Sequence, residues 1–199
     1  MFPLLSTFGR RSRVGLYVFL ALLLFVTIGL LVAFLSGIFD RDETSTQEDV
    51  APSDPTLYLT VPRLGIYDHT VRNDASESAL AIGAIKLPDT DFPWQEGDKN
   101  TYIACHRLGY PDTESYNQCL DLPMMQQGDE ITLKDANGEA YEYRVSEFLQ
   151  VAPTDTWVTE RSEGRQIVSL QTCIENYNDF YTLGPNWLVR YIVRADQVS

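Results

Sequence analysis

The chain opens with a long apolar segment that no charged residue interrupts. Residues 14–39 contain no charged side chain over 26 positions, and a helix rising about 1.5 Å per residue would carry them across a hydrocarbon core of roughly 30 Å. Arginines precede this segment at positions 10, 11 and 13, and the acidic stretch "DRDETSTQED" follows it. Because positive charge stays on the cytoplasmic side, the pattern predicts one transmembrane helix, with residues 1–13 in the cytoplasm and the rest outside the cell.

A cleaved secretory signal is the alternative interpretation of this segment. The apolar run is about twice the usual length of a signal-peptide core, and it has no clear small-x-small cleavage site. The letters "VAFLSG" near its end keep the alternative open. We expect an uncleaved signal-anchor that makes the protein a single-pass protein of the cell membrane.

Residues 40–56 are polar, contain prolines and show no periodicity, which predicts a flexible stalk. Beyond them, short apolar runs alternate with polar positions, as in strands that bury one face. The clearest example is 129–151, where two alternating segments flank Asn137-Gly138, the preferred dipeptide of a tight hairpin turn. Residues 57–199 are therefore predicted to form one mainly β domain, an antiparallel barrel or sandwich, with further strands in 56–66, 100–107, 165–173 and 186–198 and short helices in 76–83 and 119–128.

The charge of this outer part is strongly negative. Three of the 15 basic residues are the arginines before the apolar segment, so 12 basic residues follow it. All 28 acidic residues also follow it, which gives the outer part a net charge of about −16. A surface of this sign repels nucleic acid and anionic lipid headgroups. No Cys or His spacing suits zinc, and the chain has only two histidines, so we expect no metal or other cofactor.

Three residues at predicted strand ends have the chemistry of a nucleophilic site. The apolar run 167–173 ends on Thr172-Cys173, His106 closes the strand around 100–107, and Arg190 lies at the start of the last strand. A thiol nucleophile needs a proton-transfer group and a donor for the developing oxyanion, and these residue types fill those roles. Their spacing alone is not specific.

Each of these residues lies in a distinct local motif: "SLQTC" at 169–173, "YIACHR" at 102–107 and "RYIVRA" at 190–195. The first is similar to the T-L-x-T-C signature, the second to the strand ending in a small residue, His and often Arg, and the third to the arginine-carrying strand of one family. In these motifs the chain resembles the sortases, the membrane-anchored cysteine transpeptidases of Gram-positive bacteria. The segments "LTVPRLGI", "AIGAIKLPDT" and "LPMMQQGDEITL" extend the resemblance over most of residues 57–196, in the order His, Cys, Arg.

The resemblance implies a sortase-like closed antiparallel β-barrel of about eight strands, with Cys173 as nucleophile and His106 and Arg190 as its catalytic partners. Arg194 competes for the role of Arg190, because it lies on the same face of the strand by period two. We prefer Arg190, which is nearer the predicted rim. Thr172 is expected to set the approach of the substrate.

Departures from the family pattern occur at three places. Ser169 stands where the motif usually has Thr, and Cys105 stands where many sortases have Gly before the histidine. The connection 174–187 is long and rich in Tyr, Asn and Gly. We expect it to form a loop beside the site whose aromatic side chains contact the substrate; the alternative is that they only hold the loop.

The chain has three cysteines, which is an odd number, and their predicted location outside the cell permits disulfides. If Cys173 is the catalytic thiol, Cys105 and Cys119 are free to pair across a short loop. Such a bridge would constrain the loop that follows His106.

The activity implied by the resemblance is a transpeptidation. Cys173 would attack the Thr carbonyl of an LPXTG-like sorting signal on a secreted protein, and an amine of a cell-wall peptide precursor or a pilin lysine would resolve the thioester. Asp54-Pro55 is followed by Thr56 instead of an aromatic residue, which favours an open site and class D or E over the pilin-type class C. The alternatives are a hydrolytic cysteine peptidase and a non-catalytic, membrane-anchored ectodomain that binds surface proteins.

Overall fold

The computed structural model describes residues 17, 23–24, 27 and 51–198. The chain divides into two units, Met1–Glu48 and Asp49–Ser199. Apart from the four positions just given, the predicted tip 1–13, membrane segment 14–39 and residues 40–50 of the stalk lie outside the described residues. Among those that are described, none belongs to a helix both long and apolar enough to cross a membrane.

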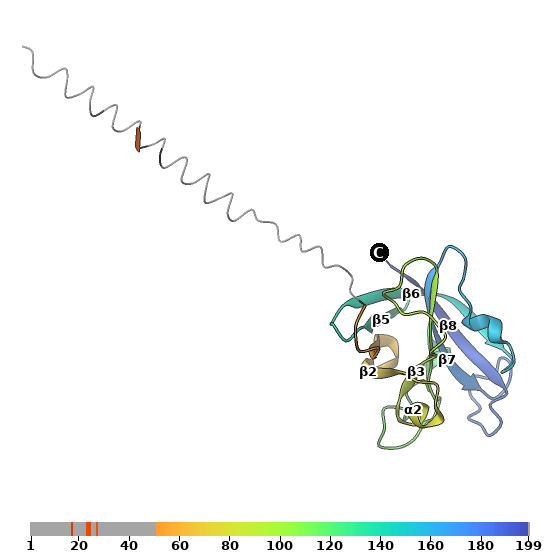
Figure 1. Ribbon diagram of the computed structural model, residues 1–199. Coiled ribbons are helices and arrows are strands. Elements are labelled where there is room, and N and C mark those ends of the chain that lie inside the picture. The colour runs from red at the N-terminus through yellow and green to blue at the C-terminus, as the bar shows by residue number, and fades with distance from the viewer. Residues whose placement is uncertain (1–16, 18–22, 25–26, 28–50, 199) are drawn as a thin grey trace, which may run out of the picture. The chain divides into compact units, whose positions relative to one another are not determined.

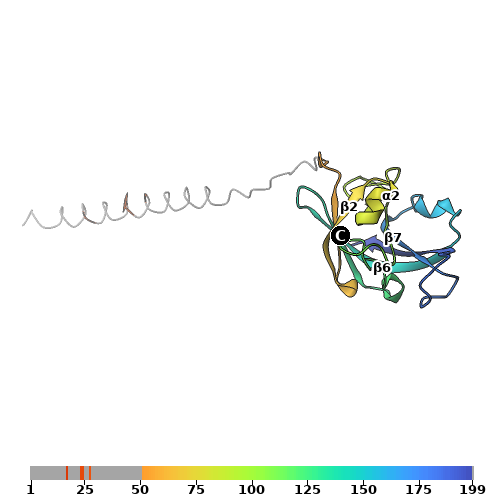
Figure 2. The same cartoon turned by 90° about the horizontal axis from the view of Figure 1, so that it is seen from below.

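The second unit is mainly β and closes into an eight-stranded barrel in the order β1-β2-β3-β4-β7-β8-β6-β5 (Figures 1 and 2). This confirms the predicted fold class, and the first strand begins at the residue where the domain was predicted to begin. The strands are β1 (Leu57–Val61), β2 (Ile66–Asn73), β3 (Ala84–Lys86), β4 (Lys99–Ala104), β5 (Glu130–Lys134), β6 (Ala140–Val151), β7 (Gln166–Ile174) and β8 (Val189–Gln197).

The expectation of a wholly antiparallel barrel needs one correction. Six neighbouring pairs are antiparallel, but β2 pairs with β3 and β4 pairs with β7 in parallel. A parallel pair requires a crossover connection. The helix α2 (Glu77–Ile82) supplies it between β2 and β3, and the hairpin β5–β6 lies within the connection from β4 to β7.

Short helical elements fill the connections. The predicted helix 76–83 is present as α2, where Ser76 caps the first turn by accepting a hydrogen bond from the Ala79 amide. The predicted helix 119–128 contains only the 3-10 turn η2 (Leu122–Met124). Pro123 would lie in the interior of a helix that began at residue 119, where its missing amide is unfavourable, and Met125 is extended and ends the turn. Two more 3-10 turns are η1 (Pro62–Leu64) and η3 (Thr156–Thr159).

Alternation along β7 and β8 divides their side chains between two faces. Leu170, Ile174, Tyr191 and Val193 point into the main core of the barrel. The intervening residues face outward, where the connection between β6 and β7 covers much of the sheet and Ile192 packs in a second, smaller cluster with Tyr102, Val151 and Val158. Cys173 and Arg190 belong to this outward set.

Asn100 fastens the covering connection to the sheet. It is fully buried on β4, and its amide donates to the carbonyls of Val158 at 3.0 Å and Glu160 at 2.9 Å. Its oxygen accepts a hydrogen bond of 2.8 Å from the hydroxyl of Ser169. Ser169, the departure from the usual Thr, is therefore a buried donor on the strand that carries Cys173.

Replacing Asn100 with Ala is expected to destabilise the protein by about 2–4 kcal/mol, since two carbonyls and one hydroxyl would lose their buried partner. Thermal unfolding of the purified protein measures the change. The exposed Asn176 provides the control, and Asn176→Ala should stay within about 0.5 kcal/mol of the parent protein. Equal effects of the two substitutions would contradict this account of Asn100.

Candidate active site

The thiol of Cys173 lies beside the guanidinium of Arg190. The two residues are direct partners in the antiparallel pairing of β7 and β8. Nη1 of Arg190 donates a hydrogen bond of 3.1 Å to Sγ of Cys173 and lies 3.4 Å from the carbonyl oxygen of Trp187. Cys173 is the one free cysteine of the described chain. A free thiol that accepts a hydrogen bond from a permanent cation is suited to nucleophilic chemistry.

A cavity of about 470 Å³ opens at this pair. Residues 106–110 line it, together with Cys173, Asn186, Trp187 and Arg190. Its volume falls within the range of small-ligand pockets. The structure therefore brings His106, Cys173 and Arg190 to one cavity from three strand ends: β4 stops at Ala104, so His106 lies in the loop just beyond its strand.

Burial opposes the charged form of the nucleophile. The pKa of Cys173 is raised above its ordinary value by burial, and the charge and hydrogen bond of Arg190 offset only part of that effect. The resting group at neutral pH is therefore the thiol. Arg190 stabilises the thiolate relative to the thiol, in a site where burial would otherwise strongly disfavour the charged form.

His106 is also held in its neutral form. Burial lowers the pKa of the imidazole, and the carboxylate of Glu77 at the start of α2 raises it in part. The ring meets Tyr110 edge-on, with 5.6 Å between ring centroids. Nε2 is buried without a hydrogen-bond partner, and within the described chain the imidazole forms no hydrogen bond. A neutral imidazole in the same cavity as the thiol can accept its proton once the two come into contact.

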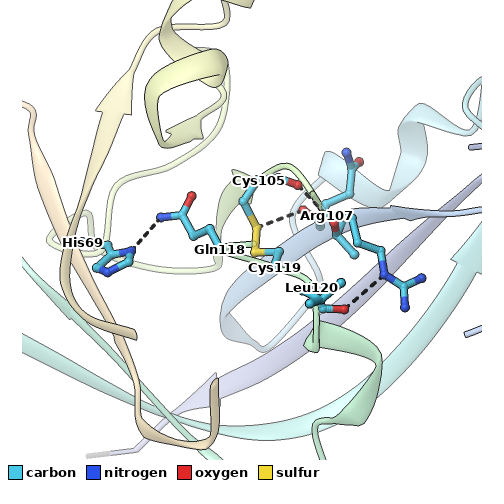
Figure 3. The surroundings of a disulfide bond; sticks show 8 residues. His69, Cys105, Arg107, Gln118, Cys119 and Leu120 are labelled. Atoms are coloured by element: carbon cyan, nitrogen blue, oxygen red, sulfur yellow. Dashed lines mark hydrogen bonds between the residues drawn. A yellow bond between two sulfur atoms is a disulfide. The ribbon is translucent and has the colours of Figure 1, made fainter. Parts of the chain in front are cut away.

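A disulfide joins Cys105 to Cys119 (Figure 3), and Cys105 is the residue before His106 in the chain. These are the two cysteines that the odd count left over. Both sulfurs lie in the barrel core, whereas Cys173 faces outward on β7, so alternation keeps the free thiol and the bridge on opposite faces of the sheet. The amide of Cys119 also donates to the carbonyl of His106 over 3.2 Å. The bridge thus constrains the loop that carries the histidine.

Thr172 has a different role from the one expected. Its side chain is 0% exposed, and its hydroxyl donates a hydrogen bond of 3.1 Å to the carbonyl of Cys105. It points into the barrel because it alternates with Cys173, so the side chain does not reach the cavity. It supports the site by joining β7 to the residue that precedes His106.

Arg194 is engaged elsewhere on the outer face. Its guanidinium pairs with Glu147 at 3.3 Å, donates to the Val158 carbonyl at 3.1 Å and lies over the ring of Trp157. These contacts fix the connection that covers the sheet. Arg190, and not Arg194, is the arginine that contacts the thiol.

The long connection between β7 and β8 forms one wall of the cavity through Asn186 and Trp187. Glu175 closes this loop, since its carboxylate accepts hydrogen bonds from the amides of Asn186 at 2.9 Å and Trp187 at 3.1 Å. Phe180 packs against Tyr191, while Tyr181 is 83% exposed. Of the aromatic residues in this connection, Trp187 thus lines the cavity, and Phe180 holds the loop against the barrel.

Sequence reasoning missed the opposite wall, Leu108, Gly109 and Tyr110. The available signal was their position inside the loop between the two paired cysteines. No group of three or more metal-ligating side chains occurs in the part of the chain that the structure describes.

A family model described as the sortase domain matches residues 59–198. Solved structures with a similar fold include sortase C of Streptococcus pneumoniae, with 24% identity, 71% of this chain and 65% of that chain covered, and a TM-score of 0.60. Sortase C-1 of Actinomyces oris has 20% identity, 74% of both chains covered and a TM-score of 0.61. The sortase D5 transpeptidase of Clostridium perfringens has 20% identity, with 72% of this chain and 79% of that chain covered and a TM-score of 0.56. A search of curated proteins found no match.

Removing the disulfide with the double substitution Cys105→Ala and Cys119→Ala is expected to lower the free energy of unfolding. The bridge closes a loop across a sequence separation of 14, for which the entropy of the unfolded chain predicts a loss of about 3 kcal/mol. Denaturant unfolding measures it. A loss below about 1 kcal/mol would show that the loop is held by its other contacts.

Replacing Arg190 with Ala is expected to raise the pKa of the Cys173 thiol further, because the charge and the hydrogen bond by which Arg190 favours the thiolate are lost. The rate of alkylation by iodoacetamide as a function of pH reports this pKa without a substrate. Arg194→Ala is the matched control on the same strand and should leave the midpoint unchanged. Equal shifts from both arginines would contradict the assignment of Arg190.

Proposed function

The chain belongs to the sortase family, and on that premise we propose that it cleaves an LPXTG-like sorting signal after Thr and transfers the protein to an amine. The observation that carries the proposal is the hydrogen bond from Arg190 to the free thiol of Cys173 in a cavity that also contains His106. In a non-catalytic ectodomain, Arg190 would be expected to pair with a carboxylate and Cys173 to lie in the core.

In the first proposed step, Sγ of Cys173 bonds to the Thr carbonyl carbon of the peptide while His106 takes the thiol proton. One nitrogen of the Arg190 guanidinium donates a hydrogen bond to the thiol. Its other N–H groups donate to the carbonyl oxygen of the peptide as negative charge develops on that oxygen. The Thr–Gly bond then breaks, and the imidazolium gives its proton to the leaving glycine amine. The product on the enzyme is a thioester.

In the second step, an acceptor amine attacks the thioester carbon, the carbon–sulfur bond breaks, and the proton of the amine returns to the Cys173–His106 pair. The acceptor is an amine of a cell-wall peptide precursor or a pilin lysine. Water in place of the amine would make the protein a cysteine peptidase. Both chemistries use the same residues and differ only in the acceptor.

We also propose that residues 14–39 anchor the protein in the cell membrane with the barrel outside the cell. The absence of charge over this segment and the arginines before it support this topology. Tethering the barrel near substrates held at the same surface raises their effective concentration. The class stays a prediction, since solved sortases of classes A, C and D resemble the chain to a similar degree.

Incubating the protein with LPXTG-type peptides is expected to give cleavage between Thr and Gly and a peptide thioester on Cys173, which mass spectrometry of the intact protein detects. Cys173→Ala should abolish both, because no other thiol of the described chain is free. Added amines should convert the thioester into an amide product. Cleavage that amines do not affect would favour the peptidase, and no reaction with any peptide would favour the non-catalytic ectodomain.

A further inference from the structure

Arg107, the residue after the histidine, is only 4% exposed although it lies in a loop. A guanidinium remains charged at every ordinary pH, so its burial costs free energy unless it is partnered. Its partners come from two segments that are far apart in the sequence. Nε donates a hydrogen bond of 3.1 Å to the carbonyl of Leu120 (Figure 3), and Nη2 donates to the carbonyl of Phe180.

Each of these segments also brings a carboxylate toward the guanidinium. Asp121 follows Leu120, Asp179 precedes Phe180, and both attract the charge of Arg107. Asp179 at the same time shapes its own loop, since Oδ1 accepts hydrogen bonds from the amides of Tyr181 at 3.3 Å and Thr182 at 3.0 Å. Arg107 is therefore placed between two segments that both present negative groups to it.

The two segments connected by Arg107 are continuous with the two walls of the cavity. Residues 107–110, on the disulfide-closed loop, form one wall, so Arg107 itself borders the cavity, and Asn186 and Trp187, on the loop between β7 and β8, form the other. Among the described residues, the bond from Arg107 to Phe180 is the one hydrogen bond between residues 105–121 and 175–188. Other contacts hold each loop separately: Ser115 donates to the carbonyl of Ala81 at 2.8 Å, and the Asn178 amide donates to the Gln150 side chain at 2.6 Å. These contacts fasten the loops to the barrel but do not join one loop to the other.

Stability alone does not explain a guanidinium at this position. Nη1 of Arg107 is buried without a hydrogen-bond partner, and unpaired buried donors are costly. An apolar side chain of similar volume would fill the space without that cost. What an apolar side chain would not supply is a directional link between the two loops.

We propose that Arg107 is a positioning residue that fixes the separation of the two cavity walls and thereby sets how tightly the sorting-signal peptide is held. The expected effect on peptide binding rests on the proposed function. The expected effect on the mobility of the loops does not. Arg107 makes no contact with Cys173 or Arg190 through any hydrogen bond that the described residues form, so the chemical step is affected less than binding.

The test compares Arg107→Gln and the conservative Arg107→Lys with Arg165→Gln in the full chain. Arg165 is a matched control, because it also joins separate segments, through Asp196 at 2.8 Å and Glu147 at 3.3 Å. It precedes the first residue of β7, at the opposite end of the strand from Cys173. The first readout needs no substrate and is the hydrogen-exchange protection of the Asn186 and Trp187 amides.

Arg107→Gln is expected to lower this protection about tenfold by freeing the loop to open, whereas Arg165→Gln should leave it unchanged. In the second readout, peptide cleavage, Arg107→Gln should raise KM about tenfold, as the loss of one charge-assisted hydrogen bond predicts, with kcat changed less. Arg107→Lys should recover part of both effects, because it retains the charge and one donor.

Unchanged protection in both Arg107 variants would overturn the proposal, whether or not a peptide substrate has been found. Lowered protection with an unchanged KM would overturn the link to substrate binding. Failure of the parent protein to cleave any peptide would instead count against the proposed function. If Arg107→Gln does not fold, Arg107→Lys carries the same comparison, since it keeps a buried cation between Asp121 and Asp179.

Discussion

The antiparallel pairing of β7 with β8 places Cys173 directly opposite Arg190, and the rest of the site is arranged around this contact. The distance between thiol and guanidinium is set by backbone hydrogen bonds along the whole strand pair and not by a loop. A shift of either strand by one residue would turn its own side chain into the barrel and break the contact. The contact between the thiol and the guanidinium is therefore as firmly determined as the fold itself.

The site combines this rigid pair with groups that are held near it by other means. His106 lies beyond the end of β4, in a loop constrained by the disulfide and by the hydroxyl of Thr172. Burial disfavours the charge on Cys173 and on His106 alike. Cys173 and His106 therefore face one cavity as two neutral groups, and burial keeps the reactive thiolate a minor form.

The outer face of the sheet shows how one surface serves two purposes. Toward the start of β7, Asn100 and Arg194 bind the connection between β6 and β7 through buried hydrogen bonds. Toward its end, the same face is left open and becomes the floor of the cavity. The walls of that cavity come from two loops, and the buried guanidinium of Arg107 connects them.

Sequence patterns alone predicted the mainly β domain and the strands that carry Cys173 and Arg190, because short runs of β-branched, apolar and aromatic residues bounded by polar segments mark strands locally. Local motifs singled out His106, and the odd cysteine count suggested the pairing of Cys105 with Cys119. Which strands lie side by side is decided by contacts distant in sequence, so only the tertiary structure revealed the parallel pairs, the hydrogen bond from Arg190 to the thiol and the inward direction of Thr172. The same holds for Arg107, whose two carbonyl partners lie 13 and 73 residues away along the chain and carry no local signal.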